Sequence, residues 1–322
     1  MRSPDAYLMV CFFLVCSVAR GDFELVIDVP PETSPASIGN NTQLNLSDPG
    51  SIPDNFTAGA ADGSSTNVEV NITGGTVGHH FFSYAGSIVN VSGGNFSHRF
   101  WTHGGSISNI SGGIFGPDVT CDGNSLVNIS GGQFDHEVHA LFRSTVNVWG
   151  GNIGFFQAHS ESRASFFGRE FYLDGVEMTQ LIPGQPFTIP DRDVPFSGIL
   201  ADGSPFSFML ISEHPDQQGP DVDHFDVAAI LTVTLLHAAD FDSDGDVDEM
   251  DLARWEASYG VDDLADADGD GDSDGDDFLA WQSQYTGPLD AFAATIPVPE
   301  PQAAVLLLVA GMCAMSQRRR RI

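Results

Sequence analysis

Hydrophobic and polar positions alternate through the middle of the chain, and the pattern recurs with a 19-residue period. The segments NITGGTV, NVSGGNF, NISGGIF, NISGGQF and NVWGGNI begin at Asn71, Asn90, Asn109, Asn128 and Asn147. The residues on either side of each Asn are mostly Val or Ile, so apolar and polar positions alternate. Such alternation predicts a strand whose apolar side chains point inward and whose Asn points outward. Each Gly pair predicts a corner, after which an apolar residue (Val77, Phe96, Phe115, Phe134 or Ile153) returns to the core.

One such repeat cannot bury its apolar face alone, whereas stacked repeats bury a continuous core. We therefore expect a mainly β protein with a right-handed parallel β-helix or solenoid over residues 61–165, preceded by an N-terminal segment at 21–60. Residues 166–238 lose the period but keep strand-like runs, and Ala201-Asp202-Gly203-Ser204 predicts a hairpin turn between two of them. This part is expected to be a β-rich cap over the last coil, whose backbone would otherwise stay unpaired.

The Asn column has two interpretations. Asn71, Asn90, Asn109 and Asn128 each begin an Asn-x-Ser/Thr sequon, which in a secreted protein suggests glycosylation. Asn147 keeps the repeat but loses the sequon, because Trp149 replaces the hydroxyl residue. The Asn thus follows the repeat and the sequon does not, which favours a ladder of stacked amides.

The charge of the chain is strongly negative and unevenly distributed. There are 44 acidic and 12 basic residues, for a formal net charge of −32. Nucleic-acid binding needs clustered Lys and Arg, so this balance argues against such partners. Of the acids, 17 lie between Asp240 and Asp277.

These acids form two loops with the spacing of calcium ligands, DFDSDGDVDEMD and DADGDGDSDGDD. Calcium takes six to eight oxygens, and carboxylates at loop positions one, three, five, nine and twelve, with a backbone carbonyl at seven, surround one ion. Gly245 and Gly271 occupy position six, where the chain turns sharply. The predicted ligands are Asp240, Asp242, Asp244, Asp246, Asp248 and Asp251 in the first loop, and Asp266, Asp268, Asp270, Asp272, Asp274 and Asp277 in the second. The sequence therefore predicts two Ca²⁺ sites.

Each loop is followed by a helix-like segment, DLARWEASY or DFLAWQSQY. Trp255 and Trp281 are separated by the same interval as the two loops, which is not expected of a solvated acidic linker. This duplication over residues 239–287 resembles a type I dockerin, a small α-helical EF-hand-like module. The resemblance implies two bound Ca²⁺ ions, a cohesin-like receptor and, in some organisms, a place in polysaccharide-degrading assemblies. Cellulosomal dockerins often carry small hydroxyl residues at loop positions ten and eleven, where this chain has Glu249-Met250 and Gly275-Asp276.

Both ends of the chain are typical of an exported protein. Arg2, the apolar run 6–18 and the small residues Ser17 and Ala19 predict a signal peptide at 1–20. After a linker at 288–298, Pro299-Glu300-Pro301, an apolar stretch and four arginines resemble the PEP-CTERM sorting tail of Gram-negative bacteria (299–322). That resemblance implies transient membrane anchoring, processing by an exosortase and release to the cell surface or extracellular matrix; a plain tail anchor is the alternative. Cys121 is the one cysteine between these ends, which excludes an intramolecular disulfide there.

Two further constellations lie within the repeats. His79, His98 and His136 share one repeat phase, with His80, His103 and His139 nearby. Imidazoles suit transition metals, but two adjacent coils would offer two ligands at most, so a solvated or aromatic-packed surface is favoured. Asp118, Glu137 and Asp135 would come close on adjacent coils, as in the polysaccharide lyases and hydrolases that parallel β-helices house.

The carboxylates within the repeats do not recur in a pattern that would gather them at one place, so the sequence does not favour catalysis. Similarity of fold alone does not identify a reaction. The sequence therefore favours a non-catalytic, calcium-binding protein of the cell surface or matrix, whose solenoid presents a contact surface for extracellular polysaccharide or protein. The alternative is a polysaccharide lyase or hydrolase, or a subunit that a dockerin brings to a polysaccharide-degrading assembly.

Overall fold

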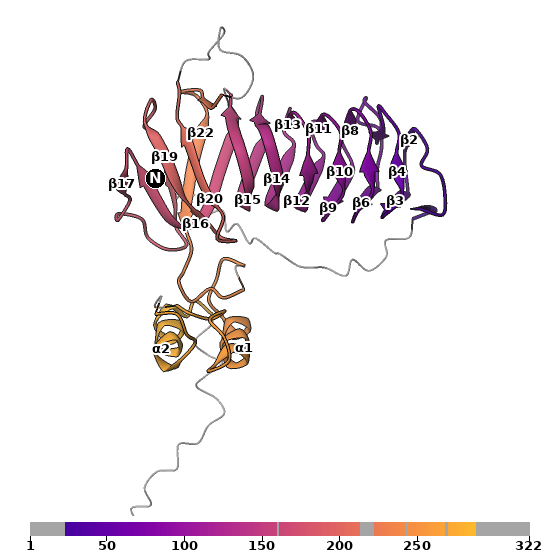
Figure 1. Cartoon of the computed structure of the whole chain (residues 1–322). Coiled ribbons are helices and arrows are strands. Elements are labelled where there is room, and N and C mark those ends of the chain that lie inside the picture. Colours follow the sequence, from indigo (N-terminus) through magenta and orange to yellow (C-terminus); the bar gives the residue numbers. More distant parts are fainter. Residues whose placement is uncertain (1–22, 160, 213–221, 243, 268–269, 288–322) are drawn as a thin grey trace, which may run out of the picture.

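The body of the molecule is a stack of parallel β-coils, with a small helical part beside one end (Figure 1). The computed structural model describes residues 23–159, 161–212, 222–242, 244–267 and 270–287. The predicted signal peptide, linker and sorting tail lie outside these residues. Within the described ranges, neither helix is long and apolar enough to cross a membrane. The predicted mainly β, parallel solenoid is confirmed by the pairing of successive coils.

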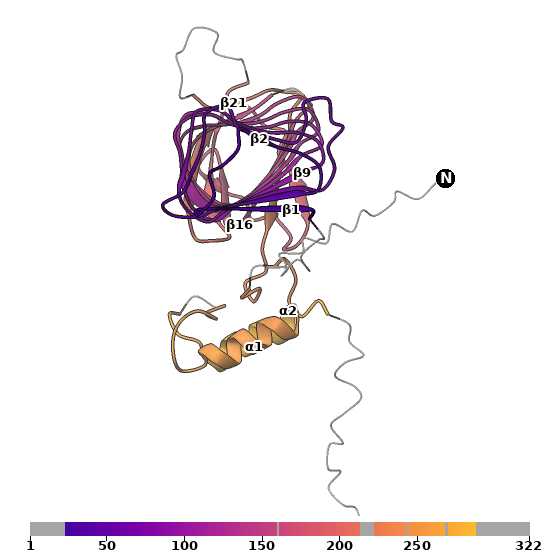
Figure 2. The same cartoon turned by 90° about the vertical axis from the view of Figure 1, so that its right-hand side faces the viewer.

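Three parallel sheets run along the stack, and the view along its axis shows the coils superposed (Figure 2). The first sheet contains β1 (Leu25–Val29), β3 (Thr42–Leu46), β6 (Val68–Ile72), β9 (Ser87–Val91), β12 (Ile107–Phe115), β14 (Leu126–Ala140), β15 (Thr145–Ala158), β16 (Arg163–Leu173) and β22 (Ile230–Leu235). The second contains β4 (Ser51–Ile52), β7 (Thr76–Val77) and β10 (Asn95–Phe96), continued by the middle of β12, β14 and β15. The third contains β2 (Ser37–Ile38), β5 (Thr57–Ala58), β8 (Phe81–Ser83), β11 (Phe100–Thr102), β13 (Val119–Cys121), the ends of β14 and β15, and β21 (His224–Phe225).

The solenoid extends beyond its predicted bounds of 61 and 165 at both ends. Strand β1 pairs in parallel with β3, and β3 pairs with β6, so the described part of the N-terminal segment, residues 23–60, belongs to the solenoid. The 19-residue period does not reveal them, because the equivalent positions Asp28 and Asn45 are 17 residues apart and Asn45 and Asn71 are 26 apart. At the other end, β22 adds to β16 in parallel register.

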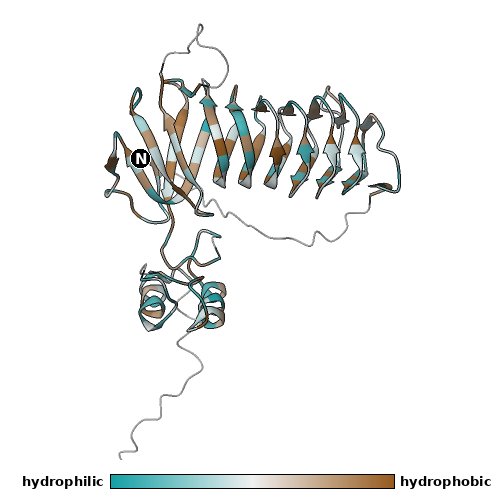
Figure 3. Ribbon diagram, in the orientation of Figure 1, coloured by the Kyte–Doolittle hydropathy of each residue, from teal (hydrophilic) through white to brown (hydrophobic). Residues whose placement is uncertain are grey.

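The core is a set of columns in which each side chain stacks on its equivalent in the next coil. One column contains Ile27, Leu44, Val70, Val89, Ser108, Val127, Val146, Ala164 and Leu231, all buried. Phe96, Phe115 and Phe134 form another, with successive ring centroids 4.4 and 4.8 Å apart. Hydrophobic and hydrophilic residues accordingly alternate along the strands (Figure 3). The predicted inward positions of the repeat are therefore confirmed.

The two glycines of each corner serve different purposes, as Gly112 and Gly113 illustrate. Gly113 has φ +99°, a left-handed conformation that other residues rarely adopt. Gly112 has an ordinary φ, but a Cβ there would lie less than 3.0 Å from the carbonyl oxygen of Ser92 on the preceding coil. The first glycine of the pair thus permits close stacking of the coils, and the second permits the turn.

The Asn column forms a continuous amide ladder on the first sheet. The Nδ2 groups of Asn71, Asn90, Asn109, Asn128 and Asn147 each donate to the Oδ1 of the Asn one coil earlier, at 2.9–3.0 Å. The ladder continues to Asn45, which donates to the Asp28 carboxylate at 2.8 Å. The four sequon Asn residues of the repeat, Asn71, Asn90, Asn109 and Asn128, therefore use their amide nitrogens within the ladder, and the predicted amide stacking is confirmed.

The end of the stack is closed by antiparallel strands. β19 (Pro195–Leu200) pairs with β16 and with β20 (Pro205–Met209), whereas β17 (Val176–Glu177) pairs with β16 and β18 (Pro186–Thr188) with β22. The hairpin predicted at 201–204 joins β19 to β20, and its Asp202 carboxylate accepts a hydrogen bond from the Gly151 N–H at 2.7 Å. Phe166, Phe171, Phe196, Phe206, Phe208 and Phe225 fill the space beneath these strands.

Two short helices follow the solenoid. α1 (Glu249–Ser258) and α2 (Gly275–Gln284) both begin with a capping box, formed by Asp248 with Asp251 and by Asp274 with Asp277. Ala239, Val247 and Trp281 form their small core, which is separate from that of the solenoid. A core of this size gives little stability by itself, so we expect the loop before each helix to contribute.

Candidate functional site

The first acidic loop, residues 240–251, folds around the carboxylates at its two ends. Asp240 accepts hydrogen bonds from the N–H groups of Asp244 and Gly245 at 3.1 and 3.0 Å. Asp251 accepts from Phe241 at 2.6 Å and from Asp248 at 2.8 Å. Gly245 adopts φ +102°, the sharp turn predicted at loop position six. Both terminal carboxylates thereby face the middle of the loop.

The second acidic loop, residues 266–277, repeats these bonds at the equivalent positions. Asp266 accepts from Asp270 and Gly271 at 3.2 and 2.9 Å, and Asp277 accepts from Ala267 and Asp274 at 2.6 Å each. Gly271 has φ +95°. The duplication seen in the sequence is therefore a duplication of local structure.

The two loops are also joined to each other through their tryptophans. The indole Nε1 of Trp281 donates to the carbonyl of Asp248 in the first loop, and that of Trp255 donates to the carbonyl of Asp274 in the second, both at 2.8 Å. The tryptophan of each helix therefore donates a hydrogen bond to loop position nine of the acidic loop that precedes the other helix. Sequence reasoning identified these tryptophans as apolar helix positions and missed this role.

The carboxylates of the first loop are crowded and poorly compensated. Oxygens of Asp240, Asp242 and Asp251 lie within 4.8 Å of one another, and Asp242 Oδ1 is enclosed without a hydrogen-bond partner. Burial and then the neighbouring Asp251 raise the pKa of Asp240 to about 7, and burial raises the pKa of Asp251 to about 6. A cation among these oxygens would relieve the repulsion and give the enclosed oxygen a partner.

The other predicted ligands are distributed around the same loops. Asp246 and Asp248 form a second close group with Asp251, and Asp272 and Asp274 form one with Asp277. Asp244 and Asp270 lie near their loop turns, where each accepts the N–H two residues later at 3.2 Å. Asp268 lies outside the described residues. Among the described residues, the predicted ligands thus form two close groups in the first loop, which share Asp251, and one close group in the second loop.

A second feature is a band of aromatic side chains on the outer face of the third sheet. Phe82 on β8 and Trp101 on β11 occupy paired positions, with ring centroids 6.0 Å apart. Tyr84 and His103 stack beside them at 4.8 Å, and His103 also stacks on Trp101 at 5.1 Å. Sequence reasoning missed this aromatic band, although its members recur at the same 19-residue spacing.

Acidic side chains continue this face beyond the aromatic band. One carboxylate oxygen each of Asp118 and Glu137 and one ring nitrogen of His139 lie within 4.8 Å of one another. Asp118 also forms an ion pair with Arg99, whose Nε lies 2.8 Å from the carboxylate. Asp118 and Glu137 therefore approach each other as the sequence suggested. Asp135 does not join them in this group; it accepts a hydrogen bond from Gln133 at 2.7 Å.

Comparisons of the chain with protein-family models, with curated proteins and with solved structures find no match.

Proposed function

We propose that this chain is an exported, calcium-binding protein of the cell surface or extracellular matrix, whose solenoid carries a contact face for polysaccharide or protein. The observation that carries the calcium part is the convergence of Asp240, Asp242 and Asp251, with an enclosed carboxylate oxygen that has no partner. Hard oxygen donors at this spacing suit Ca²⁺ better than they suit transition metals.

In this proposal each acidic loop holds one Ca²⁺ ion. In the first loop the ligands are the carboxylates of Asp240, Asp242, Asp244, Asp248 and Asp251 and the carbonyl of Asp246; the second loop uses Asp266, Asp268, Asp270, Asp272, Asp274 and Asp277 in the same way. The ion neutralises crowded carboxylates and so stabilises the loops on which the two helices depend.

Calorimetric titration of the full chain with Ca²⁺ tests this part. We expect two ions per chain, with Asp251→Asn abolishing one binding event because it removes a buried carboxylate at loop position twelve. Asp263→Asn is the matched control, since Asp263 is an exposed acid between the loops. Absence of binding heat in the wild type, or equal binding by the two variants, would refute the calcium sites.

The contact face is proposed from the aromatic band on β8 and β11. Aromatic rings offer apolar faces together with polar edges, a combination suited to the C–H faces and hydroxyls of sugars. Arg99 on the coil of Trp101, and Asp118 and Glu137 on the next two coils, supply polar groups. The proposed ligand of this face is an extracellular polysaccharide, with a protein surface as the other outcome.

Affinity electrophoresis in gels that contain neutral or acidic polysaccharides tests the contact face. We expect at least one polysaccharide to retard the chain and Trp101→Ala to remove that retardation. Ile182→Ala is the control, because Ile182 is 65% exposed and lies in the cap. Equal retardation of both variants would exclude the aromatic band as the binding face.

Two finer proposals rest on sequence resemblance alone. The paired loops and helices would form a dockerin-like module that binds a cohesin-like receptor, and the C-terminal tail would be a PEP-CTERM signal processed by an exosortase. Calcium-dependent capture of a cohesin by the full chain tests the first. Tail removal in cells with an exosortase, lost when Pro299-Glu300-Pro301 is replaced by alanines, tests the second.

A catalytic role is the second candidate, favoured by the meeting of Asp118, Glu137 and His139 beside the aromatic band. Two carboxylates at short separation can serve as acid and base, or as nucleophile, in cleavage of a glycosidic bond. Cleavage of an acidic or plant-type polysaccharide that is lost in Asp118→Asn and in Glu137→Gln would establish this role. Binding without cleavage would leave the contact function.

A further inference from the structure

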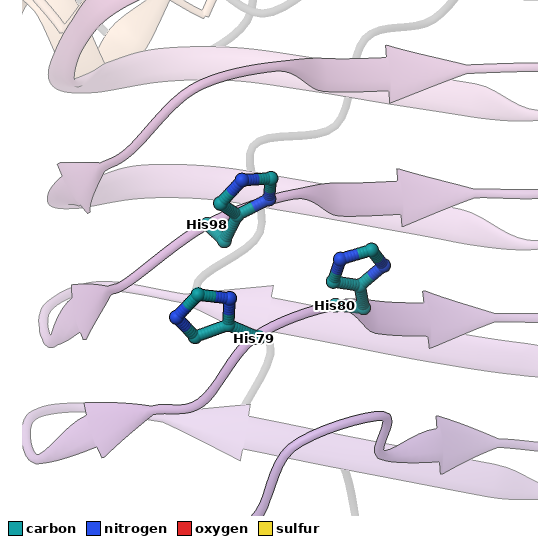
Figure 4. A group of neighbouring side chains, drawn as sticks. All are labelled: His79, His80 and His98. Carbon is teal, nitrogen blue, oxygen red and sulfur yellow. The ribbon is translucent and has the colours of Figure 1, made fainter.

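Three histidine side chains meet at one corner of the solenoid (Figure 4). His79 and His80 lie between β7 and β8, and His98 lies one coil later, between β10 and β11. The His98 ring centroid is 5.0 Å from that of His79 and 5.1 Å from that of His80. One ring nitrogen of each histidine lies within 4.8 Å of those of the other two.

Strand pairing between the two coils and the local backbone conformation place these three side chains next to one another. The pairing of β7 with β10 and of β8 with β11 sets the two coils in register, which places His98 beside His79. His80 has φ +61°, an uncommon conformation for a residue other than glycine, and its ring lies next to that of His98. The His79 N–H donates to Asp54 Oδ1 on the preceding coil at 2.8 Å.

The prediction of at most two ligands from adjacent coils is therefore wrong. It counted one histidine from each coil at the shared repeat phase. The left-handed turn at His80 brings a second ligand from the same coil, so that two coils supply three imidazoles.

The three imidazoles are available for a ligand. His98 Nδ1 is enclosed but has no hydrogen-bond partner. Burial, and then the neighbouring His79 and His80, lower the pKa of His98. Stacking of the rings explains their parallel planes, but it leaves the enclosed nitrogen unsatisfied.

We propose that His79, His80 and His98 form a binding site for a divalent transition metal ion of the zinc class. Zn²⁺ binds imidazole nitrogens at about 2.0–2.1 Å in tetrahedral geometry, which places its ligand atoms about 3.3 Å apart. The ring nitrogens now lie within 4.8 Å of one another, so binding requires the exposed His79 ring and the half-buried His80 and His98 rings to rotate toward the ion. Three protein ligands leave a fourth position for water or for an anionic group of a bound molecule.

This site is chemically distinct from the acidic loops. Imidazole nitrogens prefer Zn²⁺, Ni²⁺, Co²⁺ or Cu²⁺, whereas clustered carboxylates prefer Ca²⁺. Saturation with Ca²⁺ will therefore fill the loops and leave the histidines open for a transition metal.

Titration of the full chain with Zn²⁺ in excess Ca²⁺ tests the proposal. We expect one Zn²⁺ ion per chain by calorimetry, and Co²⁺ as a substitute should give the visible absorption of a tetrahedral nitrogen site. His98→Gln should weaken binding at least about tenfold, because loss of a mere outer-shell partner of a ligand already costs about that much and His98 is itself a ligand. The control is His103→Gln, which removes an imidazole that stacks on Tyr84 and Trp101 outside the cluster.

Three outcomes would overturn the site: no Zn²⁺ binding by the wild type, equal binding by His98→Gln, or equal weakening by the His103→Gln control. Far-UV circular dichroism of each variant checks that the coils remain folded. If His98→Gln disturbs the fold, His79→Gln replaces it, because the His79 side chain is exposed and its backbone N–H keeps the hydrogen bond to Asp54.

Discussion

Replacement of Asn109 by alanine tests whether the amide ladder stabilises the solenoid. Asn109 lies in the middle of the ladder, where it donates to Asn90 and accepts from Asn128, each at 2.9 Å. Asn109→Ala removes both hydrogen bonds and leaves one donor and one acceptor without their partners on the half-buried face of the first sheet. Each such bond contributes about 1 kcal/mol, so the free energy of unfolding should fall by about 2 kcal/mol.

Asn147→Ala should cost less, because Asn147 stands at the end of the ladder. It donates one hydrogen bond, to Asn128, while its own Oδ1 is buried without a partner. The substitution therefore removes one bond together with an unsatisfied acceptor, and we expect a loss of about 1 kcal/mol. The matched control is Asn95→Ala, an exposed position on the second sheet, which should change stability by less than about 0.5 kcal/mol.

Urea unfolding of the full chain in excess Ca²⁺, followed by far-UV circular dichroism at the β-sheet signal, measures these differences. The reasoning is refuted if Asn109→Ala unfolds with the same free energy as Asn95→Ala. If Asn109→Ala and Asn147→Ala lower the free energy of unfolding equally, the assignment of two ladder hydrogen bonds to Asn109 and one to Asn147 is contradicted.

Further predictions concern the corners, the single cysteine and the helical part. Gly112→Ala should lower the free energy of unfolding by about 2–3 kcal/mol, because its Cβ would clash with the Ser92 carbonyl oxygen. Gly39→Ala is the control and should be neutral in the same urea assay, because a Cβ at Gly39 would have no atom within 4 Å. Burial raises the pKa of the Cys121 thiol, so iodoacetamide should label Cys121 only in denaturant, as followed by mass spectrometry of the peptide that contains it; rapid labelling of Cys121 in folded protein would contradict the buried position. Trp281→Phe should weaken Ca²⁺ binding by about fivefold, because it removes the hydrogen bond to the carbonyl of Asp248; unchanged calorimetric affinity would argue against this link.

The sequence revealed those features that repeat at constant spacing. The alternation around Asn90 and Asn109 predicted strands, and the return of Phe96 and Phe115 to the core followed from the same period. A residue at a constant phase meets its own equivalent in the next coil, so register and core could be deduced from one repeat. The first coils escaped prediction because their lengths differ from the period of the later coils, although they bury the same columns.

The candidate sites were predictable only in part. The duplicated spacing of Asp240 and Asp266 predicted two similar loops, because the ligands of each loop are neighbours in sequence and the loop itself brings them together. The reciprocal bonds of Trp255 and Trp281 could not be predicted, because they depend on how the two helices pack.

The sequence by itself determined which residues recur at the same phase: the Asn ladder, the glycine corners and the two acidic loops. Only the tertiary structure decided which side chains at different phases come together, as with His80 beside His98, or His139 beside Asp118 and Glu137. The physical reason is that a period specifies stacking between equivalent positions. The direction of a side chain within a corner depends instead on local backbone angles, such as the left-handed φ of His80 and of Asp118, and on the coils packed against it.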